Sequence, residues 1–547
     1  MPTFPRRFPF GLLSAALLLS VATGTAAQDQ PKLSAPSLDS NKLQAEAEKA
    51  ERAGKWDAAL DLYLKAYLGG KPTPELRDRI RFCLRNVTQL QRHRDPAFQQ
   101  FILTLPSADA LTLFTEALTK IQSHYVDRDR ATFERLMAGS LDELDRALTD
   151  AAFRHQHLPD AGELKVLKFR QSLRDGWRAK LPATAGEVRR VARDVIMSAQ
   201  ANLGVKNPSA IVLELLCGAC SGLDEYTAYV VPSGPQAELA APILELAGYG
   251  LLIAFDAKGL FIEALIPNSW AALHSPFRKG DRIARINDKP MNGATPAKLR
   301  DAMKVPASPL GHDVELASTD EYQDGLKFRL PTPLPTVYGA DVLKGSVGYL
   351  RVAGFKENTA RELDDAIESL KARGMKALIL DLRGNPGGSL TACIAAAQRF
   401  LPSGIIVTTQ GQAAEFHNRI FSSDSGMTAH DIPVVLLVDT KTMSSAEIFA
   451  SGMKENGRAT LVGLPTFGKG FVQSPIRLES LDTGDAPGKS GFLVLSVASA
   501  HTLRGASING GGVTPHVTEV DPERQLSIAV SKAIEQIDSP SLLPTHR

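Results

Sequence analysis

The sequence predicts a multidomain α/β protein, and three observations lead to that prediction. At 547 residues, the chain is long enough for several domains of about 100–200 residues each. Apolar residues recur at helical spacing from residue 41 to about residue 233, and they alternate with polar residues from about 240 to 330. From residue 337 to residue 538, strand-like and helix-like segments alternate, which is typical of a sheet covered by helices.

Residues 1–27 have the pattern of an export signal. Arg6 and Arg7 precede an apolar run over residues 8–22, and the small residues up to Ala27 suit cleavage before Gln28. The run is short for a membrane span, which takes roughly 20 apolar residues. No later stretch is long and apolar enough to cross a membrane. We therefore expect an exported bacterial protein, periplasmic or otherwise extracytoplasmic, with no transmembrane segment in the mature chain.

The overall composition argues against a nucleic-acid partner and against a disulfide scaffold. The formal net charge is +2 with 22% charged residues, and no basic block stands out. Cys83, Cys217, Cys220 and Cys393 are too few cysteines for a disulfide framework at this length. Cys217 and Cys220 lie in an apolar helical run with no strand before it. We therefore expect small buried residues there rather than a redox site.

No metal, nucleotide or organic cofactor is expected. His155 and His157 come nearest to a pair of metal ligands, but no third ligand lies at suitable spacing, so we expect both on the surface. A glycine turn over residues 381–388 follows a predicted strand and precedes a helix, where backbone amides can hold an anion. It lacks the lysine and the Ser/Thr of a P-loop, which excludes a nucleotide site.

After a polar stretch, residues 28–100 resemble a tetratricopeptide helix pair, and an ordinary helical hairpin explains the pattern almost as well. One copy of the repeat is clear, and residues 72–90 supply a candidate next helix. A single pair cannot bury its own apolar face, so it must pack on a neighbouring part of the chain, a partner protein or a second copy. Around a turn at Gly54, the face is formed by Ala50, Ala53, Trp56, Ala59, Leu60, Tyr63 and Ala66.

Residues 433–473 combine the features needed for nucleophilic chemistry. A buried strand is predicted over residues 433–438, and Ser444 then opens a helix that ends at Gly457. At a helix N-terminus the unpaired N–H groups and the dipole favour developing negative charge, and the Ser445 amide can help to hold an oxyanion. After a second strand, over residues 459–462, a glycine-rich turn carries Lys469.

A serine hydroxyl needs a base, and Lys469 can serve as that base if burial keeps its amine neutral. Gln473 can orient the amine by a hydrogen bond without adding charge. The alternative is structural, because a Ser-Ser pair at a helix start is commonly an N-cap and a lysine between glycines is commonly a solvated loop.

The runs TMSSAEIFASGM and GLPTFGKGFVQ resemble the active-site signature of the carboxyl-terminal processing (tail-specific) serine peptidases. The resemblance implies a Ser-Lys dyad with Ser444 as nucleophile, Lys469 as general base and Gln473 as the supporting glutamine. Ser445 is a rival nucleophile, since the family has Ser-Ala pairs where this chain has two serines. The glycine turn resembles the one that supplies the second oxyanion-hole amide, which falls on Gly387 or Gly388.

Residues 101–235 resemble the helical N-terminal region of the same family, including its Leu-Asp-x-Tyr motif at Leu223–Tyr229. Residues 238–330 resemble a PDZ domain, which adds a peptide to its sheet as an extra strand and holds the terminal carboxylate on backbone amides. Those amides would be Tyr249, Gly250 and Leu251. A proline-rich linker follows, and residues 337–538 would form a crotonase/ClpP-like α/β peptidase core.

The sequence therefore predicts an exported serine endopeptidase that recognises the C-terminal tails of protein substrates through a PDZ domain. It needs no metal or organic cofactor. One alternative is a catalytically inactive adaptor that carries PDZ and helical-repeat modules. Another is a Ser-His hydrolase with His501 or His417 as base, which is disfavoured because the serine lacks a G-x-S-x-G elbow.

Overall fold

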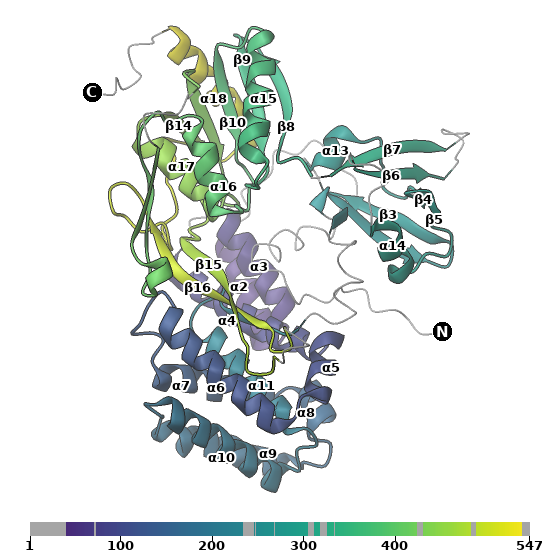
Figure 1. Ribbon diagram of the computed structural model, residues 1–547, viewed down its shortest axis with the longest axis vertical. Coiled ribbons are helices and arrows are strands. Elements are labelled where there is room, and N and C mark those ends of the chain that lie inside the picture. Colours follow the sequence, from purple (N-terminus) through teal and green to yellow (C-terminus); the bar gives the residue numbers. More distant parts are fainter. Residues whose placement is uncertain are drawn as a thin grey trace. The chain divides into compact units, whose positions relative to one another are not determined.

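The computed structural model describes residues 40–69, 73–232, 245–246, 248–266, 269–304, 311–317, 325–332, 334–423, 430–482 and 488–538 (Figure 1). The predicted export signal and the polar stretch after it lie outside the described residues. The chain divides into two compact units. The first comprises Met1–Ser233, Thr409–Asn418 and Phe471–Ser499, and the second comprises Gly234–Thr408, Arg419–Gly470 and Ala500–Arg547.

The first unit is mainly helical, as the periodicity predicts. Several of its helices begin at a side chain that accepts a hydrogen bond from the first turn, such as Thr73, Asp95 and Thr184. The helices are α2 (Ser40–Arg52), α3 (Trp56–Gly69), α4 (Pro74–Arg92), α5 (Pro96–Thr104), α6 (Ser107–His124), α7 (Phe133–Ala147), α8 (Ala151–His157), α9 (Glu163–Asp175), α10 (Ala185–Leu203) and α11 (Pro208–Ser221).

Helix α11 lies at the centre of this unit and is buried on all sides. It packs closely on α7 where two glycines meet, since a Cβ on Gly218 would lie 2.6 Å from the Gly139 carbonyl oxygen. Cys217 and Cys220 are free thiols in the buried part of this helix, which confirms that they are core residues. Cys83 and Cys393 are also free and buried.

The helical-repeat-like segment packs on the neighbouring helices of its own chain. Gly54 makes the predicted turn between α2 and α3, and Ala59, Leu60, Tyr63 and Ala66 are buried as expected. Ala53 is exposed because it belongs to the turn, so its placement on the apolar face was wrong. The predicted next helix is α4.

Helix α4 docks on α7 and α11 through buried charges. Arg92 Nη2 lies 3.0 Å from a carboxylate oxygen of Glu143 and 3.0 Å from one of Glu214. Gln89 Nε2 donates to Glu214 at 2.7 Å. The predicted need for a neighbour is therefore met inside the chain.

His157 corrects one prediction, because its side chain is buried rather than on the surface. Phe153 and His157 are one helical turn apart on α8, so they share the inward face, whereas His155 is exposed as expected. The His157 ring packs against Phe153 and His93, with ring centroids 4.9 and 5.8 Å apart. Burial, and to a lesser extent His93, lowers the pKa of His157 to about 4.

The first unit also contains an antiparallel sheet, in which β16 (Phe492–His501) pairs with β1 (Ala228–Val230) and β15 (Phe471–Arg477). The hydroxyl of Tyr229, on β1, donates to the Ser490 carbonyl at 3.0 Å. The register of β15 shifts between Val472 and Gln473, which is a β-bulge.

The described residues between 245 and 332 form a small β-rich part with its own hydrophobic core. Strands β2 (Leu251–Asp256) and β3 (Gly259–Leu265) make a two-stranded sheet. A four-stranded sheet has the order β5-β4-β6-β7. Its strands are β4 (Ile283–Ile286), β5 (Lys289–Pro290), β6 (Gly311–Leu316) and β7 (Leu326–Pro331), and the helices are α13 (Trp270–His274) and α14 (Pro296–Met303).

The rest of the second unit is a three-layer α/β/α arrangement around a six-stranded sheet of order β17-β14-β13-β10-β9-β8. Neighbouring strands are parallel except β8 and β9. The strands are β8 (Val337–Leu343), β9 (Val347–Val352), β10 (Ala377–Asp381), β13 (Val434–Val438), β14 (Ala459–Gly463) and β17 (Val517–Thr518). Strands β11 (Gly404–Gln410) and β12 (Arg419–Ser423) lie outside this sheet.

Alternate residues of the central strands belong to two different hydrophobic cores, each shared with a different layer of helices. Leu378 and Leu436 belong to the core shared with α15 (Thr359–Ala372), α16 (Leu390–Gln398) and α17 (Ser445–Glu455). Ile379 and Leu437 pack with α18 (Pro522–Asp538). Burial on both faces explains why these strands read as continuous apolar runs.

Within the described part of the chain, no single helix is long and apolar enough to cross a membrane. The bent pair Ala97–Thr104 and Ser107–His124 passes the same test only when the two helices are taken together.

Candidate active site

The candidate nucleophile Ser444 lies on a sharp turn between β13 and α17. Its φ of 58° and ψ of −128° are outside the conformations that a residue with a side chain ordinarily adopts. Such strain at one residue is typical of functional sites, where the surrounding structure holds the backbone in place. Ser444 is half-buried.

Ser445, the rival nucleophile, faces inward. Its side chain is 3% exposed, and its hydroxyl donates to the Gly388 carbonyl at 3.3 Å. Its backbone N–H is the first of α17, a position that has no acceptor within the helix. The geometry therefore separates the two serines: one presents its side chain to the surface, and the other presents an amide.

The glycine turn after β10 lies against this elbow because the carboxyl ends of two parallel strands meet. Asp381 pairs with Leu437 in the register of β10 and β13. The Asn385 carbonyl accepts a hydrogen bond from the Met443 amide at 3.0 Å. The Asn385 side chain is fully buried and donates to the Val352 carbonyl at 2.8 Å. Asn385 thus joins the turn to both neighbouring strands.

The two candidate glycines of this turn differ in what their amides do. The Gly387 N–H donates to Asn385 Oδ1 at 2.8 Å, so it is already engaged. Within the described residues, the Gly388 N–H has no protein acceptor. A Cβ on Gly387 would lie 2.8 Å from Ser444 Cβ and 2.9 Å from the Ser445 nitrogen, so only glycine allows this close approach.

The carboxylate of Glu447 connects the Ser444 turn to the Lys469 loop. It is fully buried, and its Oε2 accepts hydrogen bonds from the Ser444 amide at 2.9 Å and the Lys469 amide at 2.7 Å. Its Oε1 accepts from Thr466 Oγ1 at 2.5 Å and the Gly468 amide at 2.6 Å. Burial raises the pKa of this carboxyl, and the four donors oppose that rise.

This shared oxygen brings the two candidate dyad residues together. The backbone nitrogens of Ser444 and Lys469 can be no farther apart than the sum of their distances to Glu447 Oε2, which are 2.9 and 2.7 Å. The Lys469 side chain is 7% exposed. Its loop passes tightly over residues 508–512, since a Cβ on Gly470 would lie 2.2 Å from the Asn509 nitrogen. The glycines around Lys469 therefore have a packing role as well as a turning role.

Gln473 belongs to the first unit, whereas Ser444 and Lys469 belong to the second. Its side-chain nitrogen donates to the Tyr226 carbonyl at 2.9 Å. Tyr226 belongs to the Leu-Asp-x-Tyr motif singled out in the sequence.

In the small β-rich part, the residues Tyr249 to Leu251 lead into β2, which has β3 as its hydrogen-bonded neighbour among the described strands. The Tyr249 amide donates to the Leu246 carbonyl at 3.1 Å, and its side chain is buried. The Tyr249 amide is therefore already engaged within the chain, and carboxylate binding by Tyr249, Gly250 and Leu251 stays a prediction.

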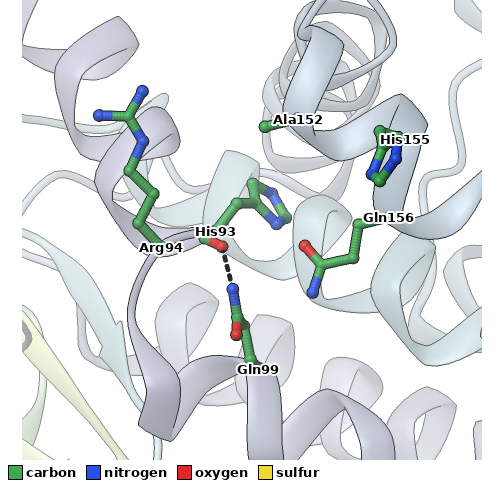
Figure 2. A pocket seen from close by; sticks show the side chains of 6 residues that line it. All are labelled: His93, Arg94, Gln99, Ala152, His155 and Gln156. Carbon is green, nitrogen blue, oxygen red and sulfur yellow. Dashed lines mark hydrogen bonds between the residues drawn. The ribbon is translucent and has the colours of Figure 1, made fainter. Parts of the chain in front are cut away.

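A pocket of about 710 Å³ lies in the first unit, and none of the predicted catalytic residues lines it (Figure 2). Apart from Ala152, its lining side chains are polar, and Gln99 Nε2 donates to the His93 carbonyl at 2.5 Å. The lining residues are His93, Arg94, Gln99, Ala152, His155 and Gln156. No group of three or more His, Cys, Asp or Glu residues with metal-binding geometry occurs in the described ranges.

Sequence reasoning missed Glu447 and Asn385 as parts of the site. The pattern Ser444-x-x-Glu447 is a capping-box signature, which could have identified Glu447 as a partner of the Ser444 amide. No local signal connects either side chain to its more distant partners.

Comparisons with known proteins show similarity to one family of peptidases. The model of Peptidase family S41 matches residues 346–519. The carboxyl-terminal-processing protease of Picosynechococcus sp. is 31% identical over 312 residues, which cover 56% of this chain and 72% of that protein. The carboxy-terminal-processing protease of Bartonella bacilliformis is 28% identical over 331 residues, covering 58% of this chain and 71% of that protein. The solved photosystem II D1 C-terminal processing protease covers 76% of this chain and 93% of its own, with a TM-score of 0.39 and 22% identity.

Proposed function

The chain belongs to the S41 family of carboxyl-terminal processing serine peptidases, and from that premise we propose that Ser444 is its nucleophile and Lys469 its general base. The observation that carries this proposal is the Glu447 carboxylate, which accepts hydrogen bonds from the backbone amides of both residues. A nucleophile and a base must be held in fixed geometry. The hydrogen bonds to the buried Glu447 carboxylate would fix the backbone of both residues.

In the proposed reaction, Ser444 Oγ attacks the scissile carbonyl while the neutral Lys469 amine takes its proton. The tetrahedral intermediate collapses to an acyl-enzyme, and Lys469 returns the proton to the leaving amine. Water then attacks the ester by the same route in reverse and releases the new C-terminus. Burial of the Lys469 side chain supports this role, because desolvation disfavours the ammonium form.

We assign the oxyanion hole to the amides of Ser445 and Gly388. Among the described residues, both N–H groups are without a protein acceptor, whereas the Gly387 N–H is bound to Asn385. Each such donor contributes about 2.7–4 kcal/mol to transition-state stabilisation. Gln473 is proposed as the group that orients the Lys469 amine.

We assign substrate recognition to the small β-rich part, acting as a PDZ domain. An extended C-terminal tail would pair with β2, and the amides of Gly250 and Leu251 would hold its carboxylate. The pairing of β2 with β3 alone, among the described strands, supports this assignment. The substrates would be exported proteins, since residues 1–27 have the pattern of an export signal.

The test is cleavage of an unfolded reporter with an apolar C-terminal tail by the wild type and by point variants. Ser444→Ala and Lys469→Ala should lose cleavage, while Ser445→Ala and the matched lysine control Lys454→Ala should retain it. If Ser445→Ala alone abolished cleavage, the nucleophile would be the wrong serine. Tail binding without cleavage by the wild type would favour an adaptor. A pH profile governed by a group near 6.5 would favour a histidine base.

A further inference from the structure

We propose that Thr442 and Asp439 are positioning residues for the peptidase site, because they join the three loops that carry its proposed chemistry. These loops are the Ser444 turn, the glycine turn over residues 381–388 and the Lys469 loop, and all three belong to the second unit. The inference rests on the proposed function and adds to it two side chains that act through the backbone of these loops.

The hydroxyl of Thr442 attaches the Ser444 turn to the glycine turn. The Thr442 side chain is fully buried and lies two residues before Ser444. Its hydroxyl donates to the Leu382 carbonyl at 2.9 Å, which is a closer acceptor than Asp439 Oδ1 at 3.1 Å. The same Leu382 carbonyl accepts from the Asn385 amide at 3.0 Å, so the hydroxyl binds a group that closes the glycine turn.

The main chain of Thr442 contacts the third loop. Its carbonyl accepts a hydrogen bond from the Phe467 amide at 3.0 Å, and Phe467 lies two residues before Lys469. Its amide donates to the Asp439 carbonyl at 3.0 Å, which closes a tight turn after β13. One buried residue therefore contacts the glycine turn through its hydroxyl and the Lys469 loop through its carbonyl, while its own chain leads into Ser444.

The carboxylate of Asp439 holds the glycine turn at a second point. Asp439 Oδ1 accepts hydrogen bonds from the Gly384 amide at 2.9 Å and the Lys441 amide at 3.0 Å. The Asp439 amide donates to the Thr442 hydroxyl at 3.0 Å, so the two residues support one another. The start of the glycine turn is thus fixed to the segment that leads into Ser444.

These contacts bear on catalysis through the Gly388 amide, which is the oxyanion donor assigned to the glycine turn. Such a donor is effective only when it lies about 2.7–3.1 Å from the oxyanion. Loss of the Thr442 hydroxyl would remove one attachment of the glycine turn and leave the Asp439 amide without its acceptor. The Gly388 amide would then be held less precisely relative to Ser444, and the loss would fall on the transition state, where the negative charge develops.

The experiment compares Thr442→Val with Thr442→Ser in the reporter cleavage assay on the full chain. Valine keeps the branched shape without the hydroxyl, whereas serine keeps the hydroxyl and loses a buried methyl group. Thr442→Val should lower kcat about tenfold with KM changed less than about twofold, and Thr442→Ser should keep kcat within about threefold. A role in packing alone predicts the opposite order, because serine leaves the larger cavity.

The matched control is Thr460→Val, near the start of β14. It removes a hydroxyl that accepts a hydrogen bond from Gln536, on α18, at 2.9 Å, and it should keep kcat within about twofold. Hydrogen exchange of the peptide over residues 382–388 gives a second readout that does not need cleavage. This peptide should exchange about tenfold faster in Thr442→Val than in the wild type, and at an unchanged rate in Thr442→Ser.

Three outcomes would overturn the inference: an unchanged kcat or unchanged exchange in Thr442→Val, an equal loss in Thr442→Ser, or an equal loss in Thr460→Val. If Thr442→Val does not fold by circular dichroism, Asp439→Ala, at a half-buried position, replaces it with the same expected fall in kcat and rise in exchange. Failure of the proposed function is separate, because Ser444→Ala would then retain the cleavage seen in the wild type while the difference in exchange persisted.

Discussion

Replacing Glu447 by glutamine should loosen the Lys469 loop and slow cleavage, because a carboxylate accepts four hydrogen bonds and an amide cannot. The substitution keeps the size of the side chain. An amide oxygen can keep two donors, such as the Ser444 and Lys469 amides. Its NH2 group would then face the Gly468 N–H, which would be left buried without an acceptor.

The expected loss can be worked out from these contacts. A buried unpaired N–H costs about 1–3 kcal/mol, and each of the two retained bonds loses about 1 kcal/mol when its acceptor loses its charge. Because an amide is cheaper to bury than a carboxylate, the net destabilisation of the loop should be about 2–4 kcal/mol. At 1.4 kcal/mol per factor of ten, local opening should become roughly 30- to 700-fold more frequent.

Native-state hydrogen exchange of the amides of Gly468 and Lys469 measures this opening directly, without unfolding the other parts of the chain. The peptide around these residues should exchange faster by that factor in Glu447→Gln, and cleavage should fall at least tenfold. Glu535→Gln, on the exposed side of α18, is the matched control and should change neither quantity by more than threefold. Unchanged exchange in Glu447→Gln would refute the role assigned to this carboxylate.

Three further predictions concern the glycine turn at Gly387, the buried carboxyl of Glu214 and the four cysteines. Gly387→Ala should reduce cleavage more than 100-fold, since its Cβ would meet Ser444 Cβ at 2.8 Å, whereas Gly374→Ala has open space and should keep activity in the same assay. Burial alone would raise the pKa of Glu214, but Arg92 and His93 outweigh it and lower it to about 2. The free energy of unfolding of the first unit should therefore fall as the pH drops from about 4.5 towards 2, because the unfolded carboxyl takes up its proton first. Thermal melts of Glu214→Gln should show a smaller dependence on pH in that range, and an equal dependence would contradict the assignment. Native protein should not react with a thiol reagent until it is unfolded, because burial raises the pKa of Cys83 and Cys217 to about 12 and keeps Cys220 and Cys393 from solvent.

Much of the secondary structure around the site could be predicted from local patterns. The strand expected over 433–438 is β13, and the helix opening at Ser444 is α17. These predictions succeeded because strand and helix periods, caps and glycine stops act within a few residues.

Predictions that depended on which face of an element meets another were less secure. The sequence showed two histidines two residues apart on a short helix, and it contained no sign that one of them, His157, turns into the core. The spacing to Lys469 favours Ser444 over Ser445 as the nucleophile, but spacing does not choose between Gly387 and Gly388. The two members of each pair differ only in the groups that their hydroxyls or amides contact.

By itself, the sequence determined the order of the elements, the strand-to-helix turn at Ser444 and the glycines that flank Lys469. Tertiary structure alone decided that Glu447 would connect those two loops, and that the Thr442 hydroxyl would meet the Leu382 carbonyl 60 residues earlier in the chain. The physical reason is the distance along the chain over which each effect acts. Backbone propensity and periodicity act over one or two turns, whereas a buried carboxylate takes its partners from whichever donors the packed core brings within hydrogen-bonding distance.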